Sequence, residues 1–193
     1  MNNKQLEEKV LKEMSSKEYD EDILLKYLSF GLALRDMYQS FHWGASSDNF
    51  YEDHLLFERL YNKVSYESDN IAEKFVGISS SNVVCPIKIS AQRCEIFNNI
   101  LEGFVISEGG KSMSYRGIYA EQAFLKISAD FYDNLDNSNL LTLGIDDLLT
   151  SIYSNHEGNI YLLKQRVVSQ DAGNAKSEED IADEESENQE EEL

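Results

Sequence analysis

The stretch 41–75, FHWGASSDNFYEDHLLFERLYNKVSYESDNIAEKF, decides the fold of this chain. Near its start, Gly44 and the small or polar run 45–49 predict a turn. The residues that follow repeat with helical spacing and predict a long helix over about 50–76. Gly77 then marks the end of this helix. The stretch therefore indicates an α-helical protein with a tight connection between two long helices.

Four side chains with metal-binding atoms share one face of this predicted helix. With His54 set at 0°, Glu58 falls near ~40°, Asp69 near ~60° and Glu73 near ~100°. Leu55 is an apolar exception on that face. Most of the apolar residues lie between about 200° and 340° and form a separate packing stripe. They are Leu56, Phe57, Leu60, Tyr61, Val64, Ile71 and Phe75.

The rest of the chain repeats the helical pattern. Apolar residues at helical spacing predict a long helix over about 20–43, another over about 114–135, and a fourth that begins within 141–146 and ends near 168. A shorter helix is predicted over about 90–106. The fold class is therefore all-α: a four-helix bundle with a short extra helix between helices 2 and 3.

Charge divides the chain into three parts. Residues 1–19 form a polar amphipathic segment, 20–168 form the bundle, and 169–193 form an acidic tail. The formal net charge is −19. The tail is acidic enough to predict disorder, and the bundle itself also carries a net negative charge. An acidic surface repels phosphate backbones, so DNA binding is doubtful.

Composition also limits the location of the protein. No apolar run is long enough to span a membrane, and the charged N-terminus lacks a signal-peptide core. The two cysteines, Cys85 and Cys94, lack metal-binding spacing and are expected to be reduced thiols. These features predict a cytoplasmic protein without a membrane partner.

Distance along the helix determines how the metal-binding residues can meet. His54 and Asp69 are fifteen residues apart, or about 22 Å along the axis. A single compact centre cannot use both ends of one helix. Two antiparallel copies about a two-fold axis would bring His54 and Glu58 of one chain to Asp69 and Glu73 of its partner. His42, at the end of the preceding helix, would complete the histidine side.

The mixed ligand set favours iron, although manganese also accepts these ligands. Each residue taken alone has an ordinary structural interpretation as well. Glu58 could hydrogen-bond to Asn62 one turn later. Trp43 taken alone is more often a core residue than part of a site. His156 has no metal-capable partner at helical spacing and is interpreted as structural or exposed.

The same residues resemble the Dps family of the ferritin-like superfamily. That family has a His-Trp pair, a histidine twelve residues after the first, an acid four residues later, and then Asp and Glu four apart. NFYEDHLLFERLY, DNIAEK and DDLLT are also similar to the family, and the match covers about 20–168. The matching residues are His42, Trp43, His54, Glu58, Asp69 and Glu73.

This resemblance implies a ferritin-like bundle that assembles through two-fold dimers into a dodecameric shell. It implies that iron, as Fe(II), is oxidised at sites shared between subunits, with hydrogen peroxide preferred, and that ferric mineral is stored inside. Trp43 would lie beside each site and take up stray oxidising equivalents. The chain departs from the family in several features. Glu58 stands where Asp is usual, the connection at 79–113 and the acidic tail are not typical, and the basic DNA-binding tail is absent.

Two further interpretations stay open at the level of sequence. The chain could be a ferritin-like structural or interaction protein with little turnover, whose acidic tail docks a basic protein partner. Asp133, Asp136, Asp146 and Asp147 lie around the turn between helices 3 and 4 and are candidates for an ion pore. Asp146 and Asp147 would equally suit the first turn of an exposed helix, where acids favour the helix dipole.

Overall fold

The computed structural model describes residues 21–46, 49–78, 84–100 and 109–190. Within these ranges it gives no side-chain description for 21, 99–100, 109–112 and 170–190. The predicted amphipathic segment at 1–19 lies outside the described residues. Among the described residues, no helix is long and apolar enough to cross a membrane.

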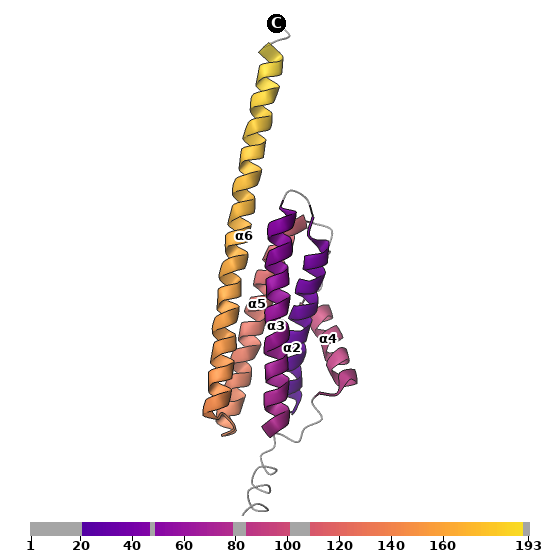
Figure 1. Cartoon of the computed structure of the whole chain (residues 1–193), viewed down its shortest axis with the longest axis vertical. Coiled ribbons are helices and arrows are strands. Elements are labelled where there is room, and N and C mark those ends of the chain that lie inside the picture. Colours follow the sequence, from indigo (N-terminus) through magenta and orange to yellow (C-terminus); the bar gives the residue numbers. More distant parts are fainter. Residues whose placement is uncertain (1–20, 47–48, 79–83, 101–108, 191–193) are drawn as a thin grey trace, which may run out of the picture.

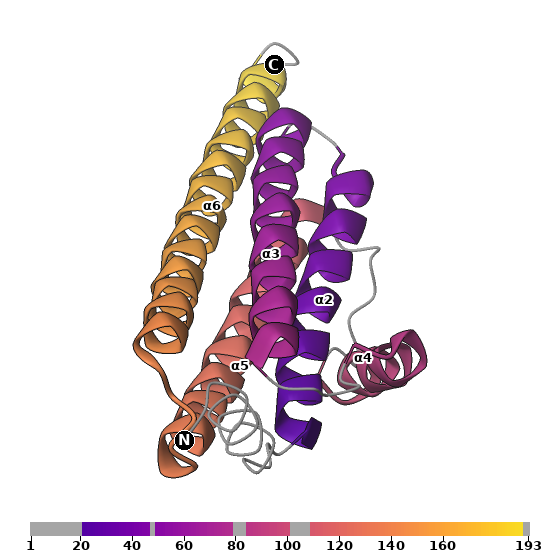
Figure 2. The ribbon, with the colours of Figure 1, turned by 60° about the horizontal axis from the view of Figure 1, so that its bottom comes forward.

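The described chain forms five helices. In chain order they are α2 (Glu21–Gly44), α3 (Phe50–Ile78), α4 (Pro86–Ile100), α5 (Gly109–Asn137) and α6 (Leu143–Glu190). The four long helices form the bundle, and the short α4 lies outside it against α2 (Figures 1 and 2). This confirms the predicted all-α class and the extra helix between the second and third long helices.

Large aromatic side chains fill the middle of the bundle. Tyr27 of α2 stacks between Phe124 and Phe131 of α5, with ring centroids 5.4 and 4.6 Å away. Phe75 of α3 packs on Phe131 at 5.3 Å. Each of these rings is almost fully buried. The apolar stripe predicted on α3 is confirmed, because its residues are either buried or packed against the core.

The turn between α5 and α6 is closed by backbone geometry. Asn139 adopts a positive φ of 54°, which asparagine tolerates better than most residues. The Leu140 amide donates to the Leu135 carbonyl, and the Asn139 amide donates to the Asp136 carbonyl. This pair of bonds is the Schellman motif that ends many helices. Thr142 then caps α6 by accepting from the Ile145 amide at 3.3 Å.

The helix boundaries differ from prediction at two places. α4 begins at Pro86 rather than near residue 90, since proline suits the first turn of a helix. α6 continues to Glu190, through most of the segment for which composition predicts disorder, and extends past the other helices (Figure 1). Glutamate and alanine are good helix formers, so acidic composition alone does not distinguish a charged helix from a disordered tail.

An ion-pair cluster attaches α4 to the bundle. Asp36 of α2 pairs with the neighbouring Arg35 and accepts from Arg93 of α4 at 2.8 Å. These side chains are partly exposed, so the electrostatic contribution is modest. The cluster links α4 to α2, and α4 lies on the side of α2 away from α6 in Figure 2.

Candidate functional site

Two histidines meet where α2 ends and α3 begins. The connection folds back so that the imidazole rings of His42 and His54 stack with centroids 3.7 Å apart. Phe50 stacks on His54 at 5.0 Å, and Tyr61 meets His42 edge-on at 5.4 Å. His42 lies in the last turn of α2. The two predicted histidine ligands are therefore adjacent within one chain.

Hydrogen bonds fix the tautomer of both rings. His42 Nδ1 lies 3.0 Å from the His54 carbonyl oxygen, and His54 Nδ1 lies 3.1 Å from the His42 carbonyl oxygen. A carbonyl oxygen can only accept, so each neutral ring carries its proton on Nδ1. The Nε2 lone pairs are then available to a metal ion. A backbone partner on the other ring nitrogen is the usual way in which proteins orient a histidine ligand.

The predicted acidic ligands lie along the outer face of α3. Glu58 is half-buried, one turn after His54, whereas Asp69 and Glu73 are exposed nearer the far end of the helix. Within the described part of a single chain, no three His, Cys, Asp or Glu side chains come together as a metal site. One chain thus brings together the two histidines, and it leaves Asp69 and Glu73 at a distance.

Trp43 is exposed rather than buried. Its relative exposure is 71%, and it lies next to His42 at the end of α2. The interpretation of Trp43 as a core residue is therefore wrong. A role of Trp43 beside a metal site stays a prediction.

A buried ion pair fixes the first turn of α3. Arg166 of α6 donates through Nε to Asp53 Oδ1 at 2.6 Å, and both side chains are almost fully buried. Asp53 immediately precedes His54. The pair therefore ties the start of α3, which carries one candidate ligand, to the neighbouring helix α6.

A second histidine–carboxylate cluster lies in the bundle core. His156 of α6 is fully buried, with Nδ1 bonded to Glu121 of α5 and Nε2 3.1 Å from Glu67 of α3. Burial alone would lower the pKa of His156, but the charges and hydrogen bonds of Glu121 and Glu67 raise it to about 9. His156 is therefore a buried cation that both carboxylates neutralise.

The neighbours of this cluster complete its hydrogen bonding. Asn155 donates to Glu67 at 2.8 Å, and Asn159 donates to Glu121 at 3.0 Å. Lys63 donates to the Asn155 carbonyl and to the Asn159 side chain. Burial lowers the pKa of Lys63, and the nearby carboxylates oppose that shift.

The structural interpretation of His156 is confirmed, and the exposed alternative is wrong. Its carboxylate partners come from other helices, so spacing along α6 could not reveal them. A signal did exist in the sequence. Glu67 falls at about 220° on α3, inside the apolar stripe. His156 likewise follows the buried Ile152 by four residues, and a polar residue in such a stripe indicates a buried polar cluster.

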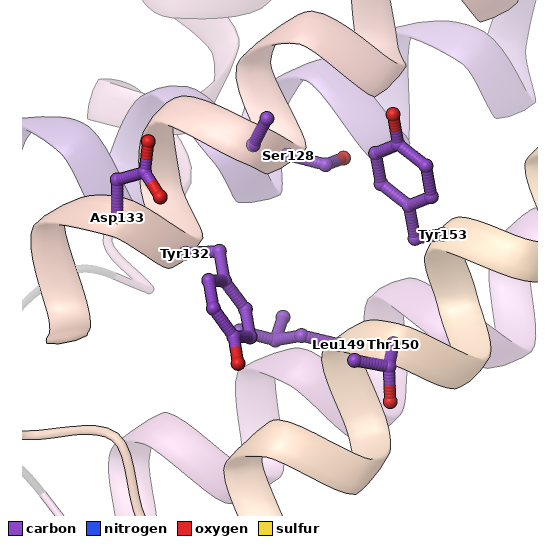
Figure 3. A pocket seen from close by; sticks show the side chains of 7 residues that line it. Ser128, Tyr132, Asp133, Leu149, Thr150 and Tyr153 are labelled. Atoms are coloured by element: carbon purple, nitrogen blue, oxygen red, sulfur yellow. The ribbon is translucent and has the colours of Figure 1, made fainter.

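A separate pocket lies on the outside of the bundle. Its volume is about 230 Å³, and its lining residues come from α5 and α6 (Figure 3). Asp133, one of the predicted pore acids, lines it beside Tyr132, whose hydroxyl donates to Asp146 at 2.9 Å. The carboxylate of Asp146 raises the pKa of Tyr132. The pocket contains no histidine, and the pore assignment stays a prediction.

Comparison with known proteins agrees with this geometry at the level of the fold. No family model matches the chain, and no curated protein matches its sequence. Solved structures do match: the fold is a four-helix bundle of the ferritin-like kind. The same fold is found in Dps proteins.

Three Dps structures illustrate the likeness. A Dps from Thermosynechococcus elongatus matches with a TM-score of 0.60 and 19% identity, over 76% of this chain and 90% of that one. A Dps from Vibrio cholerae O1, described as a ferritin-like diiron-carboxylate protein, gives 0.64 and 16%, over 76% and 87%. A point mutant of Dps1 from Mycobacterium smegmatis gives 0.60 and 18%, over 76% and 93%.

Proposed function

We propose that this protein oxidises Fe(II), preferably with hydrogen peroxide, at sites shared between two subunits, and stores the ferric product inside a shell. The observation that carries the proposal is the His42–His54 pair, with both Nδ1 atoms bonded to backbone carbonyls, which leaves the Nε2 atoms without a hydrogen bond among the described residues. Imidazole and carboxylate together suit iron. The site would act inside the cell, in the cytoplasm.

A second copy would complete the site. The midpoint between residues 54 and 73 coincides with the midpoint between 58 and 69, so one two-fold axis near the middle of α3 would bring His54 level with Glu73 and Glu58 level with Asp69. Such a contact generates two equivalent sites. Each would contain His42, His54 and Glu58 from one subunit, and Asp69 and Glu73 from the other.

The exposed apolar side chains of α3 support this arrangement. Tyr51 and Tyr66 are 67% and 69% exposed, and Leu55 and Val76 are also exposed. At 100° per residue all four fall between about 40° and 120°, on the same side of the helix as the acidic ligands. Apolar side chains gathered on one exposed face are typical of a surface that binds another protein. We propose that six such dimers form a dodecamer.

Peroxide-dependent oxidation of Fe(II), followed by absorbance, tests the activity. We expect the triple variant His42→Ala, His54→Ala, Asp69→Ala to lose this reaction. The control is Glu52→Ala, which removes an exposed acid from the same helix, outside the ligand face. Equal rates in the triple variant and the wild type would refute the site. Light scattering on the same samples measures the particle size and tests the shell separately.

Two other outcomes point to different functions. A protein that binds no Fe(II), measured by metal analysis after incubation, would be a structural or interaction protein, with the acidic tail as a docking arm for a basic partner. We expect no compaction of DNA, because the formal net charge of −19 opposes binding to phosphates. A salt-sensitive gel shift with duplex DNA would contradict that expectation.

A further inference from the structure

The pocket between α5 and α6 is lined by side chains one helical turn apart on each helix. Ser128 and Tyr132 are four residues apart on α5, and Leu149 and Tyr153 are four residues apart on α6 (Figure 3). Leu149 and Ser128 are buried, whereas the two tyrosines are partly exposed. The pocket therefore has a buried floor and one aromatic ring from each helix.

The hydroxyl protons of the lining are largely engaged within the protein. Ser128 donates to the Phe124 carbonyl oxygen at 2.8 Å. Thr150 donates to the Asp146 carbonyl oxygen at 2.8 Å, and Tyr132 donates to the Asp146 carboxylate at 2.9 Å. A hydroxyl group has one proton, so these three groups offer a ligand their lone pairs and no donor. The pocket therefore favours a ligand that donates hydrogen bonds, and it disfavours an anion.

The charge at the pocket is negative. Asp133 is an exposed carboxylate in the lining, and none of the described residues that line the pocket is lysine, arginine or histidine. Asp146 adds a second carboxylate through its contact with Tyr132. The face of an aromatic ring is itself negative, and it attracts an ammonium ion. A carboxylate beside two tyrosine rings is therefore suited to an organic cation.

The size of the pocket limits the size of this cation. The pocket volume is about 230 Å³, and an apolar cavity of about 150 Å³ already holds benzene. The pocket thus has room for an apolar body of that size together with an ammonium group. Asp133 and Tyr153 lie at opposite ends of the lining, with Leu149 between them (Figure 3). The charged group is therefore expected at the Asp133 end.

We propose that this pocket binds a small organic ammonium ion, a primary amine that carries a compact apolar body. The ammonium group pairs with Asp133 and lies against the face of the Tyr132 ring. The apolar body packs on Leu149 and Tyr153. This inference does not depend on iron oxidation, because the pocket is formed by α5 and α6, whereas the histidine pair belongs to α2 and α3.

Isothermal titration calorimetry on the full-length protein, at neutral pH and low ionic strength, tests the proposal. The probe is 2-phenylethylamine, which joins an ammonium group to a benzene ring. Two analogues isolate the charge: 2-phenylethanol is neutral, and 3-phenylpropionate is an anion. We expect the amine to bind about tenfold more tightly than the alcohol, because its hydrogen bonds are charge-assisted. We expect no binding of 3-phenylpropionate.

Variants of the lining locate the bound amine. Asp133→Asn should weaken binding of the amine about tenfold and leave the alcohol unchanged. The matched control is Asp130→Asn, which removes an exposed acid of the same helix outside the lining and should change the affinity less than about twofold. Tyr132→Leu keeps an apolar side chain but removes the ring face, so the amine should bind about two- to fivefold more weakly. Ala129→Trp, at an exposed residue of the lining, should fill the pocket and abolish binding of both ligands.

Three results would overturn the ammonium site. They are an amine that binds no more tightly than the alcohol, equal binding of the amine to Asp133→Asn and the wild type, and binding that survives Ala129→Trp. Circular dichroism confirms that each variant is folded. The double variant His42→Ala, His54→Ala should bind the amine as the wild type does. Loss of Fe(II) oxidation in that variant therefore tests the proposed function and leaves this inference standing.

Discussion

The buried cluster around His156 makes the stability of the bundle depend on pH. In the folded protein the pKa of His156 is raised from 6.5 to about 9 by the two carboxylates that contact it. A raised pKa means that the folded state holds the proton more tightly than the unfolded chain does. The stabilisation of the fold by protonated His156 is therefore fully present below pH 6.5 and is lost as the pH rises through about 9.

The contribution of His156 to the free energy of unfolding can be calculated from the shift in its pKa. A difference between 6.5 and about 9 corresponds to roughly 3 kcal/mol. Removing the imidazole should have a comparable effect at neutral pH, because Glu67 and Glu121 would be left buried without their cation. Breaking a buried ion pair in this way costs about 3–5 kcal/mol. The His156→Gln variant should therefore be much less stable than the wild type at pH 6.5, and the two should converge at high pH.

Urea denaturation followed by circular dichroism measures this effect over a series of pH values. Protein concentration is held constant, because association of subunits also changes the apparent stability. Titration of Lys63 and the tyrosines affects both proteins, so the difference between wild type and variant isolates His156. A difference that stays constant from pH 6.5 to pH 9 and above would refute the assignment of a buried imidazolium.

Two further substitutions test the packing around the sites. Arg166→Met removes the buried partner of Asp53, so we expect a loss of about 3–5 kcal/mol in the free energy of unfolding, and Fe(II) binding measured on the folded variant should weaken as the start of α3 loosens. Phe131→Ala empties the centre of the aromatic core and should cost about 3–5 kcal/mol by the same denaturation assay. Tyr115→Ala is the exposed control, and a loss equal to that of Phe131→Ala would contradict the assignment of the core.

The sequence predicted those features that depend only on where a residue lies along its own helix. The four long helices and the apolar stripe of α3 follow from periodicity, and they are confirmed. The placement of His42 against His54 depends on the turn that joins their helices, and the spacing indicated only that they could lie close. No spacing rule placed Glu121 beside His156, because these residues come from different helices and meet through the packing of the bundle.

The described part of the chain holds a buried histidine–carboxylate cluster and a histidine pair near the surface, and their hydrogen bonding favours different roles. In the core, both ring nitrogens of His156 contact carboxylates, and Glu67 and Glu121 also accept from asparagines. A metal ion could enter that cluster only by displacing a proton whose pKa is raised to about 9. Near the surface, within the part of the chain that the structure describes, the hydrogen bonds of His42 and His54 are made through Nδ1. The core cluster therefore suits stability, and the surface pair suits the binding of a metal ion.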